Sequence, residues 1–356
     1  MFRVMAAVAR GLATMIDTHF PAMEFAFAYG SGVFKQAGYS SISKEEHGNE
    51  TRGGPMIDMI FAVEDPLQWH AQNIEMNADH YALLPRKLGP KVIVNVQQSA
   101  ASLYYNTLVP FPPSISLFQG QLMKYGVVST ADLTDDLRDW KTLYSSGRLQ
   151  KPVSFLKWSP ALEKPLRTNL RSALSAALLL LPSNFSEQML FLQITSLSYQ
   201  GDMRMGIAEN PKKVENIVNF GDSMTRFRQL YQAHIDSFVE DGILVRNTNG
   251  ISYSGTDPEY SLECDASTTA KLVACLPIPV QHDMVKVVAH GVRPGSTFSE
   301  LLERGLDPSL SGLAFSHVLK SIVSHYSQRQ TLKGIFTAGV SKSIVYSFQK
   351  IAKRLL

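Results

Sequence analysis

Residues 25–32 read FAFAYGSG and residues 56–63 read MIDMIFAV, and these two stretches decide the fold. The apolar run Phe25–Tyr29 is typical of a buried strand, and it stops at a Gly-Ser-Gly turn. Met56–Val63 predicts a second buried strand with a single acid inside it. The polar, glycine-rich residues 38–54 predict a loop between them. We therefore expect neighbouring strands, one ending in the turn and the other carrying the acid.

This pairing of a turn and an acid indicates phosphate chemistry. Backbone N–H groups at Gly30 and Gly32 can approach a phosphate closely, and the Ser31 hydroxyl adds a donor. Asp58 on the neighbouring strand can hold a Mg²⁺ ion that bridges the same triphosphate. Together they predict nucleotidyl transfer. The alternative is an ordinary turn beside a structural acid that is satisfied by hydrogen bonds.

The metal arrangement departs from a common pattern. Many nucleotidyltransferases carry two acids two residues apart on such a strand, and Ile60 occupies the second position here. A second carboxylate must then come from elsewhere. Glu24, Asp132 and Asp202 are the candidates.

A second polar cluster lies at residues 199–205, YQGDMRM. Asp202 and Arg204 would project to one side if this piece is extended, and arginine binds phosphate in bidentate fashion. Lys124, at the start of a predicted strand, could also meet a phosphate. The alternatives are a loop salt bridge between Asp202 and Arg204 and a solvated lysine at a strand end.

Composition limits the class of protein. A chain of 356 residues suggests two or three domains, and 45% hydrophobic with 18% charged residues indicates a globular chain with a sizeable core. Two cysteines exclude a disulfide-dense scaffold and a four-cysteine zinc site. The longest apolar run, residues 176–181, is too short to cross a bilayer. Residues 1–11 predict the first helix of the fold, with a remnant of an organellar targeting segment as the alternative.

Charge is concentrated at the C-terminus. The net charge is only +3, which argues against a nucleic-acid binder. The last acid is Asp307, and residues 308–356 carry seven Lys or Arg. From Ser341 onward the tail predicts an amphipathic helix on an anionic membrane surface, although a helix docked on the core gives the same periodicity. The residues expected to meet the membrane are Lys342, Phe348, Lys350, Ile351, Lys353 and Arg354.

The remaining pattern predicts an α/β front, a helical middle and a mixed end. Further strands are expected at residues 91–96 and 124–128, and short β pieces within 241–280. Helices are expected at residues 67–82, 133–144, 161–181, 186–197, 211–220, 224–238, 298–304 and 314–326.

Several of these segments resemble, in the right order, those of the mitochondrial translocator assembly and maintenance protein family. That family is the mitochondrial phosphatidate cytidylyltransferase, and the resemblance spans roughly residues 20–330. The segments that carry it are FPAMEFAFAYGSGVF (20–34), MIDMIFAV (56–63), NADHY (77–81), KYGVV (124–128), LY (143–144), GRLQKPV (147–153) and YQGDMRM (199–205).

The resemblance implies an α/β (α+β) fold in three parts. These are a nucleotidyltransferase domain at residues 1–130, a helical, winged-helix-like domain at 131–235, and a C-terminal region at 236–356 that ends in a basic amphipathic helix. It implies that CTP and phosphatidic acid give CDP-diacylglycerol and diphosphate, with Mg²⁺ as cofactor. It places the protein peripherally on the matrix side of the mitochondrial inner membrane, where its product feeds cardiolipin synthesis.

The resemblance also implies roles for individual residues. Gly30 and Ser31 would hold the CTP β- and γ-phosphates, and Asp58 would hold Mg²⁺. Lys124, Asp202 and Arg204 would contact phosphate or metal.

Two other readings compete with this one. The first is an enzyme of the same fold acting on an RNA 3′ end or a protein side chain. The second is a non-catalytic peripheral adaptor that supports an inner-membrane protein translocase, in which Asp58 would be structural.

Overall fold

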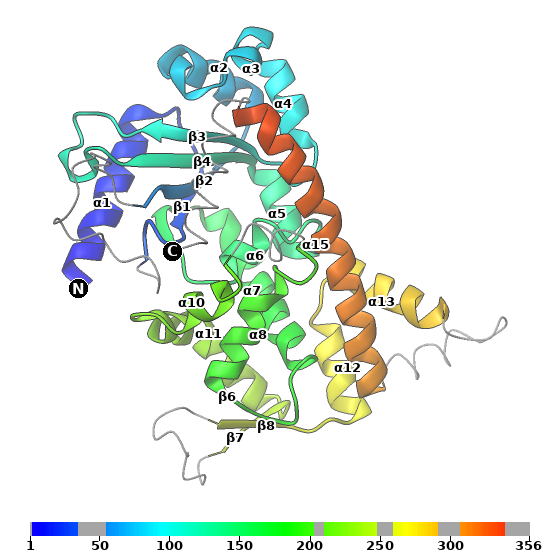
Figure 1. The fold of residues 1–356 in the computed structure, drawn as a ribbon. Helices are drawn as coiled ribbons and strands as arrows, with labels where there is room; N and C mark the ends of the chain where they lie inside the picture. Colours follow the sequence, from blue (N-terminus) through cyan, green and yellow to red (C-terminus); the bar gives the residue numbers. More distant parts are fainter. Residues whose placement is uncertain (1, 35–54, 203–209, 248–258, 291–306, 339–356) are drawn as a thin grey trace.

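The computed structural model describes residues 2–34, 55–202, 210–247, 259–290 and 307–338. Within these ranges the chain forms a five-stranded sheet with helices on both faces, a helical block and a second sheet of three strands (Figure 1). The predicted α/β fold class is therefore confirmed.

The larger sheet has the order β3-β4-β2-β1-β5. The strand β2 runs parallel to β4, and the other pairs are antiparallel. Both decisive stretches are strands at its centre, as predicted. The five strands are β1 (Phe25–Tyr29), β2 (Ile57–Val63), β3 (Tyr104–Pro110), β4 (Leu122–Ser129) and β5 (Ser154–Lys157).

Both faces of this sheet are buried, which explains the continuous apolar runs in β1 and β2. Met59 and Phe61 of β2 pack on one face with Leu12, Met15 and Ile16 of the N-terminal helix. Alternate residues point the other way, because side chains of a strand alternate between faces, and these pack against later helices. The covering helices are α1 (Phe2–His19) on the first face and α5 (Thr130–Asp139), α6 (Ser146–Leu149) and α7 (Glu163–Leu178) on the second.

A helical block follows the sheet and shares α7 with it. Its strands form a small antiparallel sheet of order β6-β8-β7, so helices are followed by a hairpin, as in a winged-helix-like unit. The block contains α8 (Glu187–Leu197), α10 (Lys213–Val218), α11 (Ser223–Glu240), β6 (Asn184–Ser186), β7 (Leu244–Asn247) and β8 (Glu259–Leu262).

Among the described residues, one further group of helices lies beyond the β3 edge of the sheet, and another forms the C-terminal part (Figure 1). The long helix α15 runs from the helical block back to the sheet domain (Figure 1). The helices beyond the sheet are α2 (Pro66–Met76), α3 (Leu83–Leu88) and α4 (Pro90–Gln98). The C-terminal helices are α12 (Ala266–Ala274), α13 (Ile278–His290) and α15 (Pro308–Ala338).

The strand predicted at residues 91–96 is wrong, because this segment lies in the helix α4. Pro90 at its first turn presets helical φ, and the buried residues Ile93 and Gln97 are one helical turn apart. The predicted helix at 133–144 stops at Asp139, where Trp140 adopts a left-handed φ of 51°. The strands β3 and β5 and the helices α12 and α13 were not predicted.

Some predictions concern residues outside the described ranges. The helix at 298–304 and the tail from Ser341 both lie there. No described helix is long and apolar enough to span a membrane. The predicted domain boundaries at residues 130 and 235 cut across the sheets. The strand β5 lies after residue 130 but pairs with β1, and the paired strands β7 and β8 lie after residue 235. The division into three domains stays a prediction.

Candidate active site

Asp58 lies near the start of β2, at the end of the sheet where β1 finishes. It stands opposite Tyr29 of β1 on one side and Lys124 of β4 on the other. The Lys124 Nζ lies 3.9 Å from the Asp58 Oδ1, and the Asp58 side chain is 27% exposed. The carboxylate is therefore reachable from solvent and has a cation beside it.

The Gly-Ser-Gly turn meets this carboxylate, as the sequence predicted. Gly30 has a φ of +80°, and a Cβ placed on it would lie 3.5 Å from the Asp58 Oδ2. Gly32 lies so close to the start of β2 that a Cβ there would come within 2.4 Å of the Met56 carbonyl oxygen. The geometry requires glycine at both positions, and Ser31 is half-buried between them.

Three cations that the sequence did not assign to the site continue it toward the helical block. The Arg148 guanidinium stacks on Tyr144 at 3.8 Å and lies 5.1 Å from the Tyr29 ring, next to Asp58. The ammonium groups of Lys151 and Lys213 lie 5.0 Å and 5.1 Å from the ring of Tyr199. The only sequence signal for them was the segment GRLQKPV (147–153), which contains Arg148 and Lys151.

A buried carboxylate positions the segment that carries these cations. Asp136 of α5 accepts hydrogen bonds from the backbone N–H groups of Thr142, Leu143, Ser145 and Ser146 at 2.7–3.0 Å. The hydroxyls of Thr142 and Ser146 also donate to it, at 2.8 and 2.9 Å. With six donors on one carboxylate, the loop before α6 is held in one conformation, and the position of Arg148 follows from it.

Two of these cations, Arg148 and Lys151, have no carboxylate partner among the described residues. Lys151 is buried, and its Nζ donates to the Ser198 hydroxyl at 2.8 Å. Burial lowers the pKa of Lys151 well below its usual value, and the charges of Arg148 and Lys213 lower it further. The Arg148 Nε is buried without a hydrogen-bond partner, and no ion pair involving Arg148 or Lys151 occurs among the described residues. An anionic ligand at this place would relieve both features.

Two of the three candidate metal partners of Asp58 are wrong. Glu24 precedes β1, and its backbone N–H donates to Ala62 near the far end of β2. Asp132 follows the far end of β4, where Ser129 donates to it at 2.6 Å. Both acids lie about five residues along the strands from Asp58, roughly 16 Å at the usual rise.

The other predicted residues divide as follows. Asp202 is buried, in the turn that follows α8 and Tyr199, so it lies on the cationic side of the site. Arg204 lies outside the described residues. Ile60 shares a face of β2 with Asp58 and is fully buried in the core, so an acid there would have no solvent. Among the described residues no three His, Cys, Asp or Glu side chains gather as a metal site.

The histidines near this sheet belong to a separate structural network on its opposite face. His70 is fully buried between the Tyr81 hydroxyl at 2.8 Å and the Gln97 amide oxygen at 2.9 Å. Burial lowers the pKa of His70 to about 4, and the hydrogen bond that the ring donates to the Gln97 amide oxygen opposes this shift. Tyr125, the neighbour of Lys124, accepts from Asn73 at 3.0 Å in the same network.

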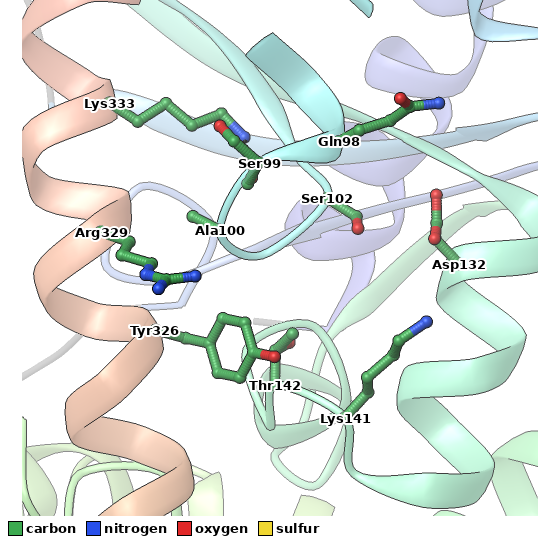
Figure 2. A pocket seen from close by; sticks show the side chains of 10 residues that line it. All are labelled: Gln98, Ser99, Ala100, Ser102, Asp132, Lys141, Thr142, Tyr326, Arg329 and Lys333. Atoms are coloured by element: carbon green, nitrogen blue, oxygen red, sulfur yellow. Dashed lines mark hydrogen bonds between the residues drawn. The ribbon is translucent and has the colours of Figure 1, made fainter. Parts of the chain in front are cut away.

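A cavity of about 740 Å³ lies between α5, α15 and the loop that joins α4 to β3. Figure 2 shows Arg329 and Lys333 along α15 on one side of it and Asp132 and Lys141 on the other. Its lining does not include Asp58 or the glycine turn. The Lys333 Nζ donates to the carbonyls of Gln97 and Ser99, at 2.8 and 2.6 Å, and burial lowers the pKa of Lys333 to about 7. These bonds fasten α15 to the sheet domain.

The mixed sheet, with a glycine turn and an adjacent acid at the end of its central strands, is consistent with a fold of the nucleotidyltransferase class. A family model described as "Phosphatidate cytidylyltransferase, mitochondrial" matches residues 12–353, and the chain belongs to this family. Its members are named for the transfer of a cytidylyl group to phosphatidic acid.

Curated relatives with that name are similar over nearly the whole chain. The protein from Rattus norvegicus is 38% identical over 344 residues, covering 95% of this chain and 93% of its own. The protein from Xenopus laevis is 40% identical over 336 residues, covering 94% and 91%. The protein from Schizosaccharomyces pombe is 37% identical over 351 residues, covering 96% and 83%. The family resemblance is thereby confirmed.

Proposed function

We propose that this chain joins CTP to phosphatidic acid at the Asp58 site, giving CDP-diacylglycerol and diphosphate. The observation that carries the proposal is the position of the Asp58 carboxylate directly beside the Gly30 turn, where a Cβ on Gly30 would lie 3.5 Å from the Asp58 Oδ2. The partly buried Arg148 continues the site from Tyr29, the strand neighbour of Asp58, and the buried Lys151 follows beyond it. A triphosphate is the anion that this arrangement of donors and cations suits, and family membership supports CTP as its source.

The reaction needs alignment and charge neutralisation. A phosphate oxygen of phosphatidic acid forms a bond to the α-phosphorus of CTP, and the bond from that phosphorus to the bridging oxygen breaks to release diphosphate. The nucleophile is already anionic, so no strong general base is needed. The turn at Gly30 and Ser31 binds the β- and γ-phosphates, and Lys124, Arg148 and Lys151 neutralise the leaving diphosphate.

Mg²⁺ is part of the proposal, with Asp58 as its ligand from the protein. Magnesium sites on nucleotides use one or two carboxylates together with substrate phosphates and water, so a single exposed carboxylate beside a phosphate turn fits the ion. When bound, it withdraws charge from the phosphate oxygens. Asp202 and Arg204 are further residues proposed to bind phosphate or metal.

The cellular setting is also a proposal. The relatives are named as mitochondrial, and the basic, acid-free C-terminus supports peripheral attachment to an anionic membrane. We place the protein on the matrix side of the inner membrane, where its product would feed cardiolipin synthesis. Residues 342–354 of the tail are proposed as its membrane contact. We propose no nucleic-acid partner for the protein.

The test is diphosphate release from CTP with Mg²⁺ and vesicles that contain phosphatidic acid. Asp58→Asn removes the charge with little change of shape, and we expect release to fall by about a hundredfold or more. Asp79→Asn, which neutralises an exposed carboxylate, is the matched control and keeps full activity. Full activity of Asp58→Asn would refute the role of Asp58, and a folded wild-type protein without release would favour the non-catalytic adaptor.

A further inference from the structure

The short helix α3 exposes an unusual amount of apolar surface. Three of its six residues are leucines, and Leu83, Leu84 and Leu88 are 60%, 56% and 50% exposed. Met76, at the end of the preceding helix, is 53% exposed. Pro85 is the residue of α3 that is buried beneath them. Clustered exposed leucines in a water-soluble domain indicate an interaction surface.

The charges around these leucines have one sign. Arg86, Lys87 and Lys91 are exposed on α3 and at the start of α4. The sequence contains no Asp or Glu between Asp79 and Asp132, a stretch that includes α3, α4 and the two strands that follow. The surface is therefore apolar with a positively charged border, which is the pattern of elements that lie at an anionic lipid–water boundary.

The position of α3 fits a lipid surface better than a core contact or a second protein. It stands at one extremity of the molecule together with α2 and α4, beyond the β3 edge of the sheet (Figure 1). The bonds from Lys333 to Gln97 and Ser99 fasten the last turns of α15 to the end of α4, so α3 belongs to a region that is held in place on the sheet domain.

We propose that the α3 face, formed by Leu83, Leu84 and Leu88 with Arg86, Lys87 and Lys91, is a second membrane-docking surface that seats the folded domain on anionic lipid. It acts in addition to the C-terminal tail. The inference relies on the proposed function only for the lipid nature of the substrate. The leucines enter the boundary between headgroups and acyl chains, and the three cations contact lipid phosphates.

The first experiment replaces all three leucines by serine and measures co-sedimentation with phosphatidylcholine vesicles that contain phosphatidic acid. We expect vesicle binding to weaken about tenfold or more, because the apolar area that enters the lipid is lost. Turnover on vesicles falls in parallel. Turnover on short-chain phosphatidic acid dispersed as monomers stays unchanged, since α3 lies outside the Asp58 site.

Matched variants separate lipid docking from other effects. Leu310→Ser with Leu313→Ser removes two exposed leucines at the opposite end of α15 and leaves vesicle binding unchanged. Replacing Arg86, Lys87 and Lys91 by glutamine removes the preference for anionic over neutral vesicles. A chain without residues 341–356 retains part of its vesicle binding, and adding the leucine substitutions removes that remainder.

A direct probe covers the case in which the triple variant does not fold. Leu84→Trp combined with Trp158→Phe places one exposed indole on α3, because Trp69 and Trp140 are buried. We expect its emission to shift to the blue on anionic vesicles and to be quenched by brominated acyl chains.

Three results would overturn the proposal. They are wild-type vesicle binding by the folded triple-serine variant, an indole that brominated lipid does not quench, and a loss of self-association without a loss of lipid binding. The last would assign the face to a second copy of the chain. All three use binding readouts, so they stand even if the protein does not turn over CTP.

Discussion

Lys151→Met tests whether the buried cations exist for a ligand or for the fold. The wild-type ammonium is buried, donates to the Ser198 hydroxyl at 2.8 Å and has Arg148 and Lys213 as charged neighbours. Methionine has nearly the same length and no charge. If the cluster serves a triphosphate, the substitution weakens CTP binding and does not weaken the fold.

The expected magnitudes follow from these contacts. A hydrogen bond to a charged group contributes about 1.5–3 kcal/mol. The loss of a lysine contact to phosphate therefore corresponds to a roughly 10- to 150-fold larger dissociation constant for CTP. In the unliganded protein the substitution removes one hydrogen bond, worth about 1 kcal/mol, and also a buried cation whose charged form burial disfavours. These changes oppose each other, so the free energy of unfolding stays equal or rises.

Calorimetric titration with CTP and chemical denaturation without CTP measure the two quantities separately. Lys157→Met is the control, because Lys157 is a partly exposed lysine that forms a surface ion pair with Asp17 at 3.2 Å. It changes CTP affinity and stability little. If Lys151→Met left CTP affinity intact and lowered the free energy of unfolding by several kcal/mol, Lys151 would be a structural residue and the reasoning would fail.

Two further predictions concern the framework of the site. The pKa of His70 is near 4 in the folded protein and about 6.5 in the unfolded chain, so the unfolded state binds more protons between these values and stability falls as pH falls from 6.5 to 4. The loss of stability reaches about 3 kcal/mol. Urea denaturation at pH 7 and at pH 4.5 should show it in the wild type and not in His70→Gln. If the free energy of unfolding changed equally with pH in both proteins, the prediction would be contradicted. Gly32→Ala pushes a methyl group onto the Met56 carbonyl at the start of β2, and at an overpacking cost of about 1–3 kcal/mol we expect CTP turnover to fall about tenfold or more. Gly11→Ala on α1, where the neighbours are side-chain atoms, is the control for steady-state kinetics, and equal activity of both variants would argue against a fixed turn.

The elements whose own residues determine their structure could be predicted. The strands β1 and β2 are continuous apolar runs that end at turn residues, and the helices α7, α8 and α11 carry long periodic patterns. The segment 91–96 failed because four apolar residues in six suit a strand as well as a helix, and only Pro90 and packing through Ile93 favour the helix. The strands β3 and β5 are edge strands of a mixed sheet, and long-range pairing with β4 and β1 stabilises them.

The residues of the candidate site also fall into those that local sequence indicates and those that depend on the fold. Gly30, Ser31 and Asp58 could be proposed from the sequence because local chemistry marks them, namely a turn after a strand and an acid within an apolar run, and the structure brings the turn and the acid together. Glu24 and Asp132 were wrong because the sequence does not show which end of a strand an acid occupies relative to Asp58. The sheet register determines it.

The sequence by itself determined the family, the central strands and the Gly-Ser-Gly turn, because each depends on residues that are close together along the chain. Only the tertiary structure showed that Arg148 and Lys151 lie on the side of the candidate site that faces the helical block. Asp136 holds the loop before them through six hydrogen bonds, Arg148 lies against Tyr29 of the sheet, and Lys151 is buried against Ser198 of the helical block. The cost of burying like charges depends on distances between segments that are far apart in the sequence, and for that reason the folded structure was needed to find them.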